Sequence, residues 1–316
     1  MISKMISDDT QQRVCFYCGS SIHDIVYEGA RTPSVSDFVV KNLNLVKCRN
    51  CGVLYVNPSP ASASLMRFYP QDYYSESETN SFYDMINKLN SLRSPLKKAV
   101  NEIIDETKST SDDRKVLEIG CAGGTNLIPL LRKNWMAYGI EPNTRLAQEA
   151  KANGIVVSCG FVNNLIQLPN DFDFIILNHV LEHDYNPKDL LQYCFAHMKH
   201  NSKIFVEIPV FDCLSFYFFG RYWGELEFPV HLSLMKSEHI FNLLERTGFE
   251  IESRKIRTLW GDNLRSLRHW YKSHNAKSST YLNLLTFSII VSQLCFLLFN
   301  VVFKRGEAVA IVARKP

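Results

Sequence analysis

A carboxylate that leads into a glycine-rich turn is the clearest chemical feature of the chain. Residues 115–127 read KVLEIGCAGGTNL and contain Glu118, Gly120, Ala122 and Gly124. A dinucleotide fingerprint needs glycines at relative positions one, three and six, but only the first of these positions holds glycine here. A phosphate-binding loop needs a Lys-Ser/Thr ending, which GGTNL lacks. The stretch therefore suits a cofactor whose ammonium group binds Glu118, rather than a pyrophosphate.

A second acid, Glu141, follows the next apolar run, in YGIEPN. At the carboxyl edge of a parallel sheet, an acid in this place binds ribose hydroxyls. Together, Glu118 and Glu141 predict a site for a ligand with an ammonium group, a ribose and no phosphate. The alternative is a tight structural turn flanked by two ordinary surface acids.

Four cysteines form two pairs with metal-ligand spacing, in CFYCG and KCRNCG: Cys15, Cys18, Cys48 and Cys51. Two residues between cysteines allow both thiolates to bind one tetrahedral Zn(II). Four cysteines leave no open coordination position, so the predicted zinc is structural. Buried thiols with accidental spacing, or a redox pair, are the alternatives.

The elements that must position these residues follow an alternating pattern. Short apolar runs that predict strands alternate with amphipathic stretches that predict helices, and this order is typical of a doubly wound sheet. The predicted fold is α/β, with a Rossmann-like, mostly parallel seven-stranded sheet. Its strands are expected at 115–119, 136–141, 155–160, 172–178, 202–209, 249–257 and 307–315.

Length, composition and charge limit the number of domains and the kinds of binding partner that are expected. The chain has 316 residues, 46% of them hydrophobic and 21% charged, so one large domain and one small domain are expected. A net charge of +3 with scattered basic residues argues against a nucleic-acid partner. The first residues contain no apolar run of signal-peptide length, and a cytoplasmic location is therefore expected.

These motifs resemble those of class I S-adenosylmethionine (SAM)-dependent methyltransferases. FDFIILNHVLEHDYNP at 172–187 resembles the fourth strand and the donor-site loop of that family, and 229–251 resembles a later helix-and-strand signature. CRNCGVLYVNPSP resembles a small zinc module found ahead of some members, including sugar C-methyltransferases. The resemblance implies SAM as cofactor, bound by Glu118, Gly120, Ala122, Gly124, Glu141, Pro142, Phe161, Asn178 and His179.

Three residues are candidates for the chemistry of methyl transfer. NHVLEH supplies Glu182 and His183 at the end of the fourth strand, and His183 can act as a base that Glu182 orients. His231, in WGELEFPVHLSL, is the rival base beside the acids Glu225 and Glu227. The alternative for His183 is a structural role, in which it shapes the site or caps the next helix.

An apolar stretch at 281–303 contains 23 residues and no charge. Its length suits a membrane span, but a single crossing would separate the last strand from the sheet. A packed helical hairpin, a peripheral membrane helix or a homodimer interface remain as alternatives. Membrane contact would place the protein at the inner face of the membrane.

The sequence thus predicts a zinc-binding module at 1–60, a connector at 61–90 and a SAM-dependent methyltransferase domain at 91–316, with an apolar helical insertion at about 270–305. The favoured acceptor is a small molecule, namely a sugar nucleotide, a lipid-linked glycan or another glycan precursor. One alternative is a membrane-associated O-methyltransferase of the quinone or lipid type. Another is a non-catalytic, SAM-binding zinc scaffold.

Overall fold

The structure is a computed structural model. It describes residues 10–29, 43–61, 65, 94–106, 113–162, 168–258, 263, 265–267, 269–270, 302–303 and 305–316. Most of the predicted connector at 61–90 and nearly all of the predicted insertion at 270–305 lie outside these residues.

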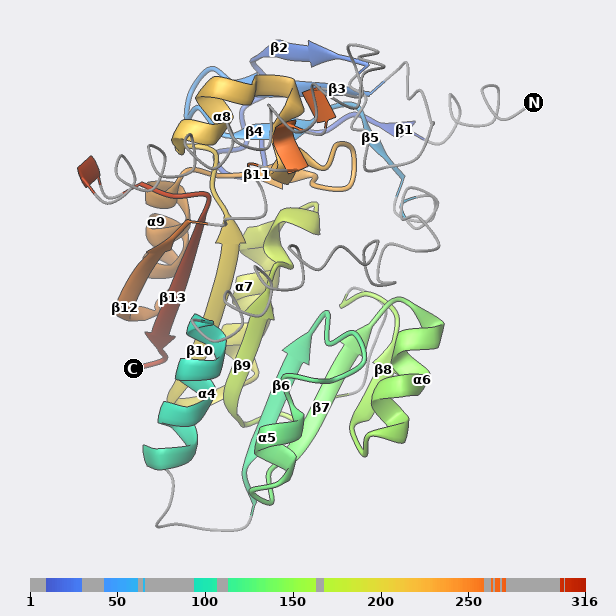
Figure 1. The fold of residues 1–316 in the computed structure, drawn as a ribbon, viewed down its shortest axis with the longest axis vertical. Helices are drawn as coiled ribbons and strands as arrows, with labels where there is room; N and C mark the ends of the chain where they lie inside the picture. The colour runs from blue at the N-terminus through green and yellow to red at the C-terminus, as the bar shows by residue number, and fades with distance from the viewer. Residues whose placement is uncertain are drawn as a thin grey trace, which may run out of the picture.

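The centre of the protein is a seven-stranded sheet in the order β12-β13-β10-β9-β6-β7-β8 (Figure 1). Five neighbouring strands, from β10 to β8, run parallel, and β13 lies antiparallel between β10 and β12. This confirms the predicted fold class. The strands are β6 (Lys115–Ile119), β7 (Met136–Glu141), β8 (Val156–Cys159), β9 (Phe172–Asn178), β10 (Met198–Pro209), β12 (Glu250–Arg257) and β13 (Ala308–Arg314).

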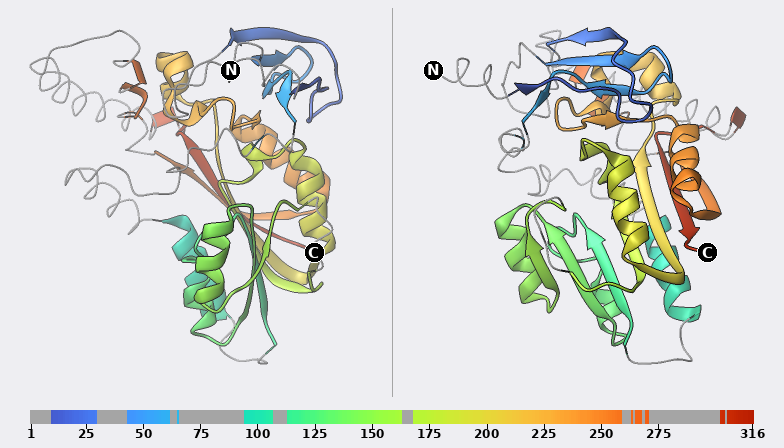
Figure 2. Two further views of the ribbon diagram at one scale, coloured as in Figure 1. Left: turned by 90° about the vertical axis from the view of Figure 1, so that its right-hand side faces the viewer. Right: turned by 180° about the vertical axis from the view of Figure 1, so that it is seen from behind.

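Helices cover both faces of this sheet (Figure 2). Side chains alternate across a strand, and β9 accordingly sends Phe174 and Ile176 to one apolar cluster and Ile175 and Leu177 to the other. The first cluster includes α4 (Pro95–Glu106) and α6 (Thr144–Ala152), and the second includes α7 (Pro187–Ala196) and α9 (Ser237–Thr247). Each fully buried large apolar side chain contributes roughly 1.5–3 kcal/mol, so β9 is a rigid base for the residues that follow it.

A smaller antiparallel sheet lies above the carboxyl ends of β9 and β10 (Figure 1). Its order is β11-β4-β3-β2, with β2 at His23–Glu28, β3 at Asn44–Cys48, β4 at Leu54–Val56 and β11 at Ser233–Leu234. Strands β2, β3 and β4 come from the amino-terminal part, whereas β11 comes from the predicted methyltransferase domain. The amino-terminal part is therefore not self-contained, and its predicted limit at residue 60 stays a prediction.

Three short helical elements lie on the carboxyl side of the large sheet, between β10 and β11 along the chain. They are α8 (Leu214–Phe219), η3 (Gly220–Tyr222) and η4 (Gly224–Leu226). Within the described ranges, no helix combines the length and the hydropathy needed to cross a membrane. The stretch at 281–303 lies outside those ranges.

Candidate active site

The glycine turn after β6 brings the backbone close to neighbouring elements. Gly120 and Gly124 have φ angles of +70° and +80°, a conformation that side chains rarely adopt. A Cβ atom on Gly120 would lie 2.9 Å from Cγ2 of Val180, and one on Gly124 would lie 2.0 Å from Cδ1 of Ile155. Both positions therefore require glycine, and Ala122 between them has a φ of 45°.

Glu118 is buried below this turn, with 1% of its surface exposed. Its Oε1 accepts a hydrogen bond from Nδ2 of Asn126 at 2.7 Å, while its Oε2 has no hydrogen-bond partner among the described residues. Burial raises the pKa of Glu118 to about 8. A buried carboxylate with an open oxygen is a group that a bound cation would stabilise.

Glu141, at the end of β7, holds the turn from the other side. Its Oε2 accepts from the backbone N–H of Ala122 at 2.9 Å, and its Oε1 accepts from that of Asn143 at 2.7 Å. Burial raises the pKa of Glu141, and the two amides oppose that shift. Each carboxylate oxygen can accept more than one hydrogen bond, so Glu141 can still receive hydroxyl donors.

The other predicted cofactor residues occupy the same edge of the sheet. Pro142 follows β7, Phe161 comes shortly after β8 and Asn178 ends β9, and all three are half-buried.

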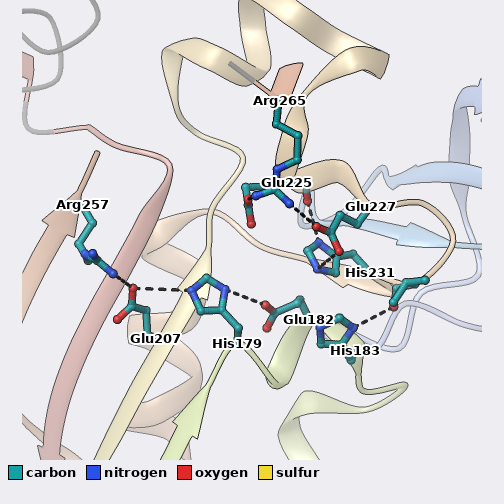
Figure 3. A network of polar contacts seen from close by, with 10 residues as sticks. His179, Glu182, His183, Glu207, Glu225, Glu227, His231, Arg257 and Arg265 are labelled. Carbon is teal, nitrogen blue, oxygen red and sulfur yellow. Dashed lines mark hydrogen bonds and ion pairs between the residues drawn. The ribbon is translucent and has the colours of Figure 1, made fainter. Parts of the chain in front are cut away.

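His179, the last of the predicted cofactor residues, directly follows β9. It has a φ of 55°, and its ring extends between two glutamates (Figure 3). Nδ1 is 3.3 Å from Oε1 of Glu182, and Nε2 is 3.6 Å from Oε1 of Glu207. Burial alone would lower the pKa of His179, but the two carboxylates raise it well above its ordinary value. The two carboxylates therefore favour the protonated ring of His179, and its predicted contact with the cofactor stays a prediction.

Glu207 extends this group of charges to the edge of the sheet. It is buried near the end of β10 and pairs with Arg257, which ends β12. Burial opposes the shift, but His179 and Arg257 together hold the pKa of Glu207 below its usual range. Sequence reasoning missed both Glu207 and Arg257. An acid within the otherwise apolar run KIFVEIP was the signal that could have identified Glu207.

The three predicted catalytic residues meet at the end of β9. Glu182 and His183 lie in the turn η2 (Leu181–His183), and His231 comes from the segment before β11. The rings of His183 and His231 are 4.7 Å apart between centroids, at an interplanar angle of 76°. The two histidines that were rival bases in the sequence are thus neighbours in one cluster with Glu182 (Figure 3).

The surroundings of His183 and His231 differ from those of His179. Burial, and then the neighbouring His231, lower the pKa of His183 to about 4, so His183 is neutral at pH 7. His231 is buried, and its Nδ1 lies 2.7 Å from the backbone oxygen of Glu225. Neutral imidazoles can accept a proton or bind a metal ion.

A second group of charges lies beside His231. Glu225 and Glu227 both pair with the guanidinium of Arg265, and Oε2 of Glu227 is 3.6 Å from Nε2 of His231. The two glutamates were recognised in the sequence as part of a polar segment before the strand. Arg265 was not recognised, because it follows Glu227 by 38 residues and belongs to no motif.

The four amino-terminal cysteines also converge. Their sulfur atoms all lie within 4.8 Å of one another, and the Cys15–Cys51 and Cys18–Cys48 pairs are both 3.5 Å apart. With Zn–S bonds of about 2.3 Å, a tetrahedral site places its sulfurs about 3.8 Å apart. The arrangement fits a tetrahedral zinc site.

Arg13 connects this amino-terminal part to the histidine cluster. Its guanidinium donates hydrogen bonds to the backbone oxygens of Tyr185 and Leu232 and, at 3.2 Å, to Oγ of Ser233. Tyr185 lies two residues after His183, and Leu232 directly follows His231. One side chain thus holds both segments that carry the histidines.

Comparisons with known proteins identify the family of the chain. A family model described as a methyltransferase domain matches residues 89–254, more than half of the chain. The mitochondrial ubiquinone biosynthesis O-methyltransferase of Rattus norvegicus is 25% identical over 190 residues, which are 53% of this chain and 54% of that protein. An uncharacterised protein of Methanocaldococcus jannaschii is 26% identical over 159 residues, which are 48% of this chain and 74% of that protein.

The chain spans about half the length of the mitochondrial enzymes that it matches. Among solved structures, a proposed sarcosine dimethylglycine methyltransferase from Galdieria sulphuraria aligns with a TM-score of 0.50 and 14% identity. The alignment covers 80% of this chain and 98% of that one. At this level of identity the likeness supports the fold alone.

Proposed function

The chain belongs to the methyltransferase domain family, and on that premise we propose that it transfers the methyl group of S-adenosylmethionine to a small-molecule acceptor. The observation that carries the proposal is the pair of buried acids at the carboxyl ends of the neighbouring parallel strands β6 and β7. Glu118 offers an oxygen without a hydrogen-bond partner among the described residues, and Glu141 spans the glycine turn.

In this proposal each of the two acids binds a different part of the cofactor. Glu118 binds the ammonium group, which stabilises its buried negative charge. Glu141 accepts hydrogen bonds from the ribose hydroxyls. The backbone at Gly120, Ala122 and Gly124 allows the close approach, and Pro142, Phe161, Asn178 and His179 complete the proposed set.

The cofactor, when bound, supplies an electrophilic methyl group on a sulfonium. The chain must then present an acceptor atom in line with that group and deal with its proton. The cluster of Glu182, His183 and His231 is the proposed acceptor end, because it lies at the end of β9, next to β6 in the sheet. The prediction that His183 or His231 takes the proton rests on their place beside this end of β9.

An oxygen acceptor is favoured by one finding, the similarity to a ubiquinone biosynthesis O-methyltransferase. The sugar or glycan acceptor predicted from the cysteine module has no support from the comparisons. We therefore propose a hydroxyl-bearing small molecule and leave the glycan precursors as competitors in the same test. Contact with a membrane, a homodimer and a cytoplasmic location stay predictions.

We also propose that Cys15, Cys18, Cys48 and Cys51 bind one structural Zn(II). The spacing of their sulfurs supports this, and so do the hydrogen bonds from Gly19 N to Cys15 O and from Gly52 N to Cys48 O, which fold both CxxC turns alike. The zinc would fix the amino-terminal sheet against the segments that Arg13 holds.

Calorimetric titration of the purified protein with SAM, S-adenosylhomocysteine and NADH tests the cofactor. We expect micromolar binding of the first two ligands and none of NADH. Glu141→Ala should weaken that binding by about 1–3 kcal/mol, or roughly 5- to 150-fold. Glu245→Ala, which removes an exposed acid of α9, is the matched control and should bind as the wild type does.

Absence of SAM binding would overturn the proposal. If SAM binds, a panel of phenolic, quinol, sugar-nucleotide and lipid-linked acceptors with labelled methyl groups separates the candidate substrates. SAM binding without transfer to any of them would favour the non-catalytic scaffold.

A further inference from the structure

The cluster of Glu182, His183 and His231 has a geometry that acid–base chemistry does not require. One donor atom from each residue lies within 4.8 Å of the other two (Figure 3). Two of the residues are adjacent in the chain, and the third lies 48 positions further on, in a segment that packs back over the end of β9. The fold thus assembles three donors of the metal-binding type around one point.

Backbone carbonyls determine which nitrogen of each histidine faces that point. Nδ1 of His183 lies 3.3 Å from the oxygen of Val230, and Nδ1 of His231 lies 2.7 Å from the oxygen of Glu225. A carbonyl oxygen only accepts, so each Nδ1 carries a proton, and in the neutral ring Nε2 carries the lone pair. Nε2 of His231 also lies 3.6 Å from Oε2 of Glu227. Metal-binding histidines are typically oriented in this way, with the other ring N–H donated to a carbonyl or carboxylate.

The carboxylate of Glu182 is completely buried. Its Oε1 lies 3.3 Å from Nδ1 of His179, while its Oε2 has no hydrogen-bond partner among the described residues. Burying an unsatisfied carboxylate oxygen is unfavourable unless a cation or a donor approaches it. Oε2 therefore has the character of an open ligand atom beside two imidazole lone pairs.

Buried acids surround the cluster. Among the described residues, Glu182 and Glu207 both lie beside His179, and Oε2 of Glu227 lies 3.6 Å from Nε2 of His231. An ion bound between Glu182 and the two histidines would therefore have carboxylates on more than one side.

We propose that Glu182, His183 and His231 bind one divalent transition-metal ion through a carboxylate oxygen and two imidazole nitrogens. Two histidines and one carboxylate are a donor set that suits Zn(II), Fe(II) and related ions and leaves coordination positions open. Bonds of about 2.0–2.2 Å require the donors to move together by about an ångström, which side-chain rotation provides.

The open positions would bind the oxygen of the acceptor, a role that rests on the proposed methyl transfer. The ion would act as a Lewis acid that lowers the pKa of a hydroxyl group. In the balanced step, the hydroxyl proton passes to water, an O–CH3 bond forms as the S–CH3 bond of the sulfonium breaks, and S-adenosylhomocysteine leaves. His183 and His231 would then be ligands rather than bases.

Binding of Co(II) by the full chain tests the site without any assay of activity. The protein is first loaded with one molar equivalent of zinc, which the four thiolates bind in preference, and is then dialysed against increasing Co(II). Bound zinc and cobalt are counted by mass spectrometry. We expect the wild type to take up one Co(II) per chain, with an absorption spectrum that lacks thiolate-to-cobalt charge transfer. His183→Gln, His231→Gln and Glu182→Gln should each weaken this uptake at least tenfold.

His200→Gln is the matched control, because His200 is exposed and lies at the start of β10, the end of that strand opposite to Glu207. It should take up Co(II) as the wild type does. Absence of Co(II) uptake by the wild type, or a spectrum that shows only thiolate ligation, would overturn the proposal even if a variant fails to fold. Equal uptake by wild type and folded variants would also overturn it.

This outcome is separate from that of the cofactor proposal. SAM titration reports on Glu118 and Glu141, whereas Co(II) uptake reports on Glu182 and the two histidines. Either site can therefore fail while the other is supported.

Discussion

Two groups of buried acids at the same edge of the sheet differ in how their charge is balanced. On the cofactor side, Glu118 and Glu141 end β6 and β7, and burial raises the pKa of both carboxyls. On the acceptor side, Glu182 and Glu207 are equally buried, yet neighbouring His179 holds the pKa of both below the usual range against the effect of burial.

The two sides differ in whether the protein itself places cations beside the buried acids. His179, Arg257 and Arg265 supply cations to the acceptor side. Among the described residues, Glu118 has only the neutral amide of Asn126 as a hydrogen-bond partner. The raised pKa of Glu118 beside an open oxygen therefore indicates a group that a charged ligand would stabilise, whereas His179 already favours the ionised carboxylates of Glu182 and Glu207.

The largest expected effect separates the two sides by activity. Glu182→Gln removes a charge from the acceptor side, so we expect kcat/KM to fall by about 10²–10⁴. The dissociation constant of SAM should stay within about twofold of the wild-type value, because Glu182 belongs to the acceptor side and not to the cofactor side. An equal loss in SAM affinity would show that the two sides are not independent.

The next effect concerns pH and the cofactor side. Because burial raises the pKa of Glu118 from its ordinary value of 4.5 to about 8 in the folded protein, the protonated form stabilises the fold. This contribution is complete below about pH 4.5 and is lost as the pH rises through about 8. Relative to Glu118→Gln, the wild type should lose on the order of 3 kcal/mol of unfolding free energy over that range.

Urea unfolding of both proteins at pH 5, 6.5 and 8, without ligand, measures this difference. Adding SAM should reduce the loss at pH 8, because the ammonium favours the ionised carboxylate. Parallel pH curves for wild type and Glu118→Gln would contradict the assignment.

Arg13→Ala should have an intermediate effect that is confined to the acceptor side. Removing the guanidinium leaves the oxygens of Tyr185 and Leu232 without its hydrogen bonds, and we expect a loss of about 1–3 kcal/mol in stability. Because the histidine segments shift, kcat/KM should fall by about tenfold at unchanged SAM affinity. Arg132→Ala, at an exposed arginine, is the control.

The smallest effect on stability and activity is expected for an ion pair that belongs to neither the cofactor side nor the acceptor side. Arg49 pairs with Asp24 at the surface, and both side chains are more than half exposed. Water and salt screen such pairs, so Arg49→Ala should leave the melting temperature and the activity unchanged within error. A clear loss would mean that the charge of the amino-terminal sheet contributes more than its exposure suggests.

The two sides also differ in how far the sequence predicts them. Glu118, the glycine turn and Glu141 lie within 24 residues, and two consecutive strand–turn units bring them together. Local patterns therefore predicted this side, and they also predicted the parallel sheet. They predicted His183 and His231 as well, but as competitors.

The acceptor side depends on contacts between distant segments, which local patterns do not contain. Arg13 reaches Leu232 across 219 positions, and Arg257 reaches Glu207 across 50. The positions of Arg13, Arg257 and Arg265 follow from the packing of the small sheet and of β12, and no spacing rule expresses that packing. The pairing of buried charges in the folded protein is thus the property that the sequence predicts least.

The two-residue strand β11 has a practical consequence for expressing parts of this protein. Ser233 and Leu234 pair with Tyr55 and Leu54. A fragment that ends at residue 60 would lose this partner and leave one edge of β4 with unpaired backbone groups, which invites strand addition and aggregation. A fragment that begins at residue 91 would lack the surface on which His231 is held. The two parts should therefore be produced, crystallised and engineered as one polypeptide.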